Sequence, residues 1–137
     1  MIQETIQAWR RNGVEMNPGA SPDELQALRD LLQCAIPADI REFYANANGM
    51  CTDVYDEHEV SFWSISKICA QRDAVADMEI GFADFLIDSW RFMFRVEGDR
   101  VIVVSGNVSP GSPPENLGTF SDFLKLYVTS PDALRIL

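Results

Sequence analysis

Four stretches of the chain carry apolar residues at the three- and four-residue spacing of an amphipathic helix. They are residues 2–11, 22–36 and 37–49, and a last stretch that begins after Thr119 or Ser121. Such spacing places the apolar side chains on one face of a helix, so the pattern predicts four helices. The apolar face of the last one should pack on a sheet.

The ends of these helices carry recognisable signals. Ser21, Pro22 and Glu24 form a capping-box sequence with proline at the first helical position, which predicts a helix start. The helix should stop before Pro37, because the residue that precedes a proline disfavours the α conformation. Gly49 is placed to end the third helix in a left-handed conformation.

The strongest β signal lies in the second half of the chain. Residues 90–96 alternate between apolar and polar side chains, and a Gly-Asp turn separates them from the β-branched run 101–104. A continuous run of this kind is typical of a central strand that is covered on both faces. Residues 85–88 are predicted to add a third strand to an antiparallel meander.

The remaining segments have weaker periodicity. Short strands are expected at residues 51–55 and 60–65, on either side of an acidic turn, and a helix at 66–78. Prolines and glycines predict a loop over 107–118. Helices followed by strands and a closing helix indicate an α+β fold, a single domain over residues 1–137. Its N-terminal helices precede a central antiparallel or mixed sheet, on which the C-terminal helix packs.

Composition is that of a globular intracellular domain. The chain has 137 residues, 47% of them hydrophobic, which is enough for a core without disulfides. We find no run of about 20 apolar residues and no signal-peptide order of charged and apolar segments, so a cytoplasmic protein is expected. The three cysteines, Cys34, Cys51 and Cys69, lack ligand or CxxC spacing, which favours structural thiols over redox or metal roles.

Negative charge is concentrated in the middle of the chain. The net charge is −10, and nine of the 21 acidic residues lie within residues 53–88, where only two basic residues occur. Such a field repels DNA and RNA and attracts basic proteins. We interpret the segment either as a surface that steers a basic protein partner or as a solvated face that only keeps the protein soluble.

Catalytic chemistry finds little support in the sequence. His58 is the single histidine, in an acidic stretch that is typical of an exposed turn; a hydrolase that uses it is the least favoured of three hypotheses. Gly-rich phosphate loops and spaced metal ligands are missing from the sequence. We therefore predict a protein that is not an enzyme and has no cofactor or metal.

Several segments resemble one family in order and in residue type. The block GASPDELQAL at residues 19–28, followed by IPADIREFY at 36–44 and Asn48-Gly49, is similar to the N-terminal signature of the SUKH superfamily. Weaker similarities follow at 62–65 (FWSI), 80–83 (IGFA) and 118–124 (GTFSDFL). Ile36 replaces the usual leucine, Met50 stands where a second glycine is common, and 107–118 departs from the pattern.

The resemblance implies a binding activity. The superfamily contains yeast cell-wall assembly regulators and bacterial immunity proteins that bind and neutralise toxins, often nucleases. It therefore implies an immunity-type protein with a basic toxin domain as partner. The alternative is a regulatory scaffold or a small-molecule-binding domain of the same fold without a toxin partner; the latter would contain a sizeable apolar pocket.

Six residues of the acidic segment are the candidate partner-binding site. Carboxylates would take the place of nucleic-acid phosphates in contacts with a nuclease, and the candidates for this role are Asp53, Asp56, Glu57 and Asp84. Aromatic residues often anchor protein interfaces, which makes Tyr55 and Trp63 candidate anchors. For Trp63, a place in the core is the favoured interpretation.

Overall fold

The N-terminal helices form where the apolar spacing predicts them. The computed structural model describes residues 1–72, 79–107 and 115–134, and it contains α1 (Ile2–Arg11), α2 (Pro22–Leu32) and α3 (Ala38–Asn46). The predicted capping box at the start of α2 is present in full. Gln33 ends α2 in a left-handed conformation, and Gly49 is also left-handed but lies beyond the end of α3.

Five strands follow in a single antiparallel sheet. Their order in the sheet is their order in the chain, β1 (Val60–Phe62), β2 (Glu79–Phe85), β3 (Trp90–Glu97), β4 (Arg100–Asn107) and β5 (Glu115–Gly118). Helix α4 (Ile65–Ala70) lies between β1 and β2 in the chain. The chain continues from β5 into α5 (Phe120–Thr129) and the 3-10 helix η1 (Pro131–Leu134). The predicted α+β fold, with a C-terminal helix packed on the sheet, is confirmed.

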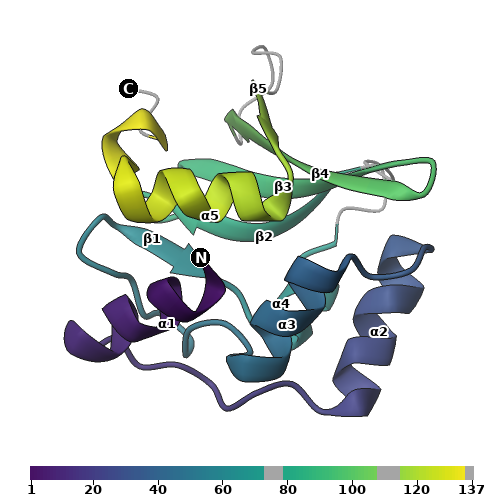
Figure 1. The fold of residues 1–137 in the computed structure, drawn as a ribbon, viewed down its shortest axis with the longest axis horizontal. Helices are drawn as coiled ribbons and strands as arrows, with labels where there is room; N and C mark the ends of the chain where they lie inside the picture. The colour runs from purple at the N-terminus through teal and green to yellow at the C-terminus, as the bar shows by residue number, and fades with distance from the viewer. Residues whose placement is uncertain (73–78, 108–114, 135–137) are drawn as a thin grey trace.

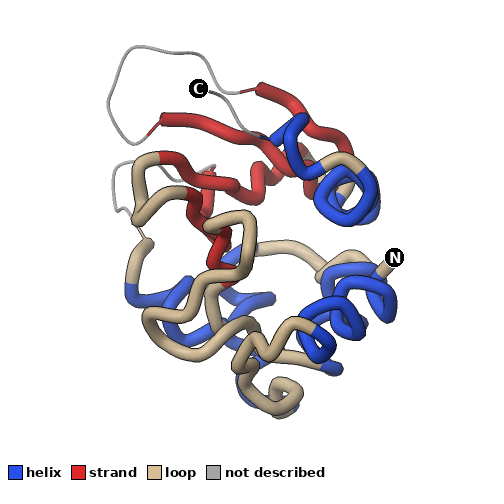
Figure 2. Tube along the Cα trace, turned by 90° about the vertical axis from the view of Figure 1, so that its left-hand side faces the viewer, coloured by secondary structure: helices blue, strands red, loops and turns tan. Residues whose placement is uncertain are grey.

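Aromatic residues fill the space between the sheet and the helices. Phe120 and Phe123 of α5 pack against Phe82, Phe92 and Phe94 of the sheet, and the rings of Phe82 and Phe94 stack 4.2 Å apart. Figure 1 shows α5 lying along the sheet and α1 below α5, and Figure 2 shows from the side that both helices lie on the same side of the sheet. The core thus lies between α1, α3, α5 and one face of the sheet.

Four strand or loop predictions differ from the structure. Residues 51–55 form turns and irregular structure, and β1 ends at Phe62 because Ser64 caps the start of α4. The strand predicted at 85–88 is β2, which ends at Phe85; residues 86–88, predicted as part of the strand, lie in the turn 86–89 that follows it. Residues 115–118, predicted as loop, pair with β4 as strand β5.

The other predicted segments agree with the structure as far as it describes them. Strands β3 and β4 match the alternating segment and the β-branched run, and Val103 and Val104 are fully buried. Helix α4 covers the beginning of the helix predicted at 66–78 but ends at Ala70, with Gln71 as its C-cap. Residues 73–78 of that prediction and most of the predicted loop at 107–118 lie outside the described residues.

Candidate functional site

The segment between Met50 and β1 is an irregular loop that its own acidic side chain organises. The Oδ1 atom of Asp56 accepts hydrogen bonds from the backbone N–H groups of His58, at 2.8 Å, and Val60, at 3.0 Å. Aspartate stabilises turns in this way because its short side chain reaches the backbone two to four residues on. Asp53 and Glu59 adopt left-handed backbone conformations, with φ of 63° each.

The second oxygen of Asp56 connects this loop to two helices. The Tyr127 hydroxyl on α5 donates to Asp56 Oδ2, and the Trp9 indole on α1 donates to the Tyr127 oxygen at 2.7 Å. Burial, and the Asp56 carboxylate beside it, raise the pKa of Tyr127 well above its ordinary value. The tyrosine therefore stays a hydrogen-bond donor, and the chain from Trp9 to Asp56 fixes the loop against the core.

A second buried carboxylate holds the loop from the side of the sheet. Asp84 on β2 is only 1% exposed, and it accepts hydrogen bonds from Trp63 Nε1 at 2.6 Å and from the Tyr55 hydroxyl at 2.8 Å. Its Oδ1 atom also accepts the backbone N–H of Asp88 at 3.0 Å. Burial, the hydrogen bond to Asp84 and the charges of Asp84, Asp88 and Asp53 raise the pKa of Tyr55.

The turn between β2 and β3 lies against this loop. The backbone N–H of Leu86 donates to the carbonyl oxygen of Glu59 at 3.1 Å, and Asp88 forms an ion pair with Arg91 at 2.8 Å. Residues 53–59 and 86–89 thus form one connected region, which we call the acidic corner. Its exposed acidic residues are Asp53, Glu57, Glu59 and Asp88.

One side of the acidic corner borders an open hollow. The hollow has a volume of about 450 Å³ and lies between the end of α1 and the loop; its walls are Asn12, Gly13, Val14, Glu15, Val54, Tyr55, Asp56 and Glu57. Glu57 is held at its rim by the Asn12 side-chain amide, which donates to it at 3.2 Å. The hollow is open to solvent, so it does not enclose a small ligand.

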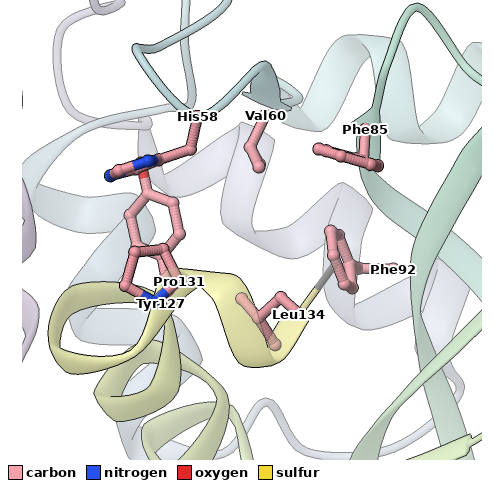
Figure 3. A pocket seen from close by; sticks show the side chains of 7 residues that line it. All are labelled: His58, Val60, Phe85, Phe92, Tyr127, Pro131 and Leu134. Carbon is pink, nitrogen blue, oxygen red and sulfur yellow. The ribbon is translucent and has the colours of Figure 1, made fainter. Parts of the chain in front are cut away.

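An apolar cavity lies behind the same loop but is very small. Figure 3 shows His58 and Tyr127 at one end and Phe85 and Phe92 at the other. Its volume is about 10 Å³, roughly the space of one water molecule. It is therefore too small for an organic ligand.

The six predicted site residues divide into surface and interior. Asp53 and Glu57 are exposed and Tyr55 is half-buried, so they are accessible in the acidic corner. Asp56, Trp63 and Asp84 are 9%, 2% and 1% exposed, and the expectation that these three present themselves to a partner needs correction. The two carboxylates are internal hydrogen-bond acceptors, and Trp63 packs in the core with Lys67 and Arg91 over its ring.

The charge of the middle segment is correspondingly less exposed than the sequence predicts. Two of its acidic residues are buried acceptors, and two others form ion pairs, Glu79 with Arg95 and Asp88 with Arg91. Asp73 and Asp77 lie outside the described residues. Among the described residues of the segment, Asp53, Glu57 and Glu59 are the exposed acidic side chains that form no ion pair with a Lys or Arg side chain.

The groups considered for catalysis do not form a reactive arrangement in the described structure. His58 is partly exposed, with Nε2 3.5 Å from a Glu57 oxygen, and its ring meets Tyr127 edge-on. Burial raises the pKa values of the Cys34 and Cys69 thiols, which disfavours the thiolate form. Among the described residues, no three His, Cys, Asp or Glu side chains could hold a metal, and no helix could cross a membrane.

Sequence reasoning missed three residues of this region. Trp9 and Tyr127 were assigned to apolar helix faces, and their polar atoms meet although 118 positions separate them. Ile87 was placed in a strand but lies in the turn with 84% of its surface exposed. The spacing of Asp56 from His58 and Val60 is the one local signal for an Asp-stabilised turn.

Comparison with known families bears directly on this arrangement. The family model of the SMI1 / KNR4 family (SUKH-1) matches residues 19–125, which run from the segment before α2 into α5. The match includes the whole acidic corner. No curated protein matches the chain significantly.

Proposed function

Because the chain belongs to the SMI1 / KNR4 family (SUKH-1), we propose that it is a non-enzymatic, cytoplasmic protein-binding domain of the immunity type. It binds a basic toxin domain, of which a nuclease is the best example, through the acidic corner. Carboxylates there occupy the positions that nucleic-acid phosphates would take on the toxin, and the toxin is thereby neutralised.

The observation that supports this proposal most is the ordered backbone that carries the exposed acids. Two internal carboxylates, Asp56 and Asp84, hold the loop and the neighbouring turn from opposite sides. A loop that is already ordered loses less conformational entropy when a partner binds. The backbone positions of Asp53, Glu57 and Glu59 therefore need little rearrangement when a partner binds.

The overall charge supports the same kind of partner. A net charge of −10 on 137 residues steers a cationic protein toward the chain from a distance. Charges at the rim of an interface mainly change the association rate and its salt dependence. The acidic corner should therefore affect how fast the partner is bound and how strongly salt opposes binding.

Neutralising the three exposed acids that have no Arg partner, Asp53, Glu57 and Glu59, tests this directly. In a variant with Asp53→Asn, Glu57→Gln and Glu59→Gln, we expect the association rate with the captured basic protein to fall about tenfold at about 50 mM salt. Asparagine tolerates the left-handed backbone at position 53. The measurement is affinity capture from cell lysate at low salt, identification by mass spectrometry, and surface plasmon resonance with the purified protein.

A control with the same loss of charge isolates the effect of position. Asp30, Glu97 and Asp99 are exposed and lie outside the acidic corner, so replacing them with Asn, Gln and Asn should change the rate much less. Equal effects of the two triple variants would mean that only net charge matters. Capture of non-basic proteins alone would favour the regulatory-scaffold alternative over the immunity role.

A further inference from the structure

The turn between β2 and β3 has an unusual backbone. Leu86, Ile87 and Asp88 are three consecutive non-glycine residues with φ of 52°, 50° and 60°. L-residues avoid this left-handed region, and a β-branched residue such as isoleucine is a clear outlier there. Strain of this kind persists only where the surrounding structure enforces it, and it is often found at functional sites.

The same turn exposes an apolar side chain. Ile87 is 84% exposed, and the only other large hydrophobic residue that is exposed in the described parts of the chain is the terminal Met1, at 41%. Leu86, next to it, is packed against the core. The turn therefore directs the Leu86 side chain toward the core and exposes the Ile87 side chain to solvent.

Hydrogen bonds from three directions hold the turn in place. The Asp88 N–H donates to the buried carboxylate of Asp84, and the Leu86 N–H donates to the Glu59 carbonyl oxygen. The Ser89 N–H donates to the carbonyl oxygens of Phe85 and Leu86. Because Asp84 also holds Tyr55, one carboxylate positions both the acidic loop and the turn that carries the isoleucine.

We propose that Ile87 is the apolar anchor of the acidic corner and that it fits an apolar pocket ringed by Lys and Arg side chains on a basic partner protein. This inference rests on the proposed function and adds the chemistry of the contact. An apolar anchor surrounded by polar groups is the usual arrangement of an energetic hot spot.

The surroundings of Ile87 specify the charge of the partner. Asp88 follows it in the chain, and Glu59 is bonded to the turn through its carbonyl oxygen. Asp53 and Asp88 both lie close enough to Tyr55 for their charges to raise the pKa of its hydroxyl. Asp88 is already paired with Arg91. A pocket lined only by neutral residues would leave the exposed carboxylates of Asp53 and Glu59 without a partner of opposite charge, whereas a basic rim would complement them.

The test separates binding from stability by changing Ile87 alone. Asparagine accepts the left-handed conformation, so Ile87→Asn should raise the melting temperature by about 4 °C. Because asparagine is polar, the same substitution should lower the affinity for the partner about tenfold or more. Ile87→Leu keeps an apolar side chain and should retain affinity within about threefold. The probe is the purified basic protein captured by the full-length chain, and its dissociation constant is measured by calorimetry.

Photo-cross-linking places the contact independently. Benzoylphenylalanine at position 87 should cross-link to the basic protein, and the same group at position 99, in the distant β3–β4 turn, should not. Unchanged affinity of Ile87→Asn, or equal cross-linking at both positions, would overturn the anchor and leave the proposed function standing. If the unmodified chain retains no basic protein, both the anchor and the proposed function are wrong.

Discussion

Replacing Asp84 with alanine is expected to lower the free energy of unfolding by about 4 kcal/mol. The carboxylate is almost fully buried and accepts hydrogen bonds from Trp63, Tyr55 and the Asp88 backbone. Its removal leaves the Trp63 indole N–H without a partner in the interior, and such a group retains its full desolvation penalty. Urea unfolding followed by tryptophan fluorescence measures the change.

Asp88 offers a matched control one turn away. Its side chain forms an exposed ion pair with Arg91, a type of interaction that contributes about 1 kcal/mol or less. Asparagine removes this charge and tolerates the left-handed backbone of Asp88, which has a φ of 60°, so Asp88→Asn should change stability only slightly. Asp84→Asn should fall between Asp84→Ala and this control, because an amide keeps one acceptor. A loss below about 1 kcal/mol for Asp84→Ala would contradict the role assigned to this carboxylate.

The helices could be predicted because their signals are local. Ser21 with Glu24, and Thr119 with Asp122, form capping boxes in the structure, and these pairs lie only three residues apart in the chain. The apolar spacing of α5 likewise identifies the face that packs on the sheet. Where both the start signal and the periodicity fall within a dozen residues, the sequence alone places the helix to within a few residues.

Strands with few apolar residues were not predictable in the same way. In β5 only Leu117 is apolar, and the strand exists because its backbone pairs with β4. In β2 a register shift between Gly81 and Ala83 breaks the alternation that marks a strand. Both features depend on pairing with the neighbouring strand, so they cannot be predicted from any short segment of the sequence.

The candidate site was predicted in its location but only partly in its chemistry. Residue type alone does not show whether an aspartate is exposed or buried, and in the structure Asp53 is exposed whereas Asp84 is buried. The difference arises because the donors of Asp84, Trp63 and Tyr55, come from other elements of the fold. A signal was available: Asp84 lies between Ala83 and Phe85, and a carboxylate between buried apolar neighbours needs internal partners.

Raising the pH above about 10 is expected to destabilise the protein by about 3 kcal/mol for each pH unit through the two buried tyrosines, Tyr44 and Tyr127. Tyr55, whose pKa is also raised, adds a smaller amount because its side chain is only half-buried. Burial raises the pKa values of Tyr44 and Tyr127 above their ordinary value, and Asp56 adds to the effect at Tyr127. The unfolded chain releases these protons near pH 10 while the folded chain keeps them. Stability is thus complete below pH 10 and falls as the pH rises above it.

Single phenylalanine variants separate the two contributions. Tyr44→Phe removes one titrating hydroxyl, a donor to the Trp63 carbonyl oxygen at 3.3 Å, and should remove about half of the slope that the two buried tyrosines contribute. Tyr127→Phe should reduce it equally but also lower stability at neutral pH, because Asp56 and Trp9 lose their shared partner. Urea unfolding between about pH 9 and 12 measures the slope, and tyrosinate absorbance identifies the titrating groups. A slope that stays unchanged in Tyr127→Phe would mean that this hydroxyl ionises as freely in the folded chain as in the unfolded one, which its place between an indole and a carboxylate opposes.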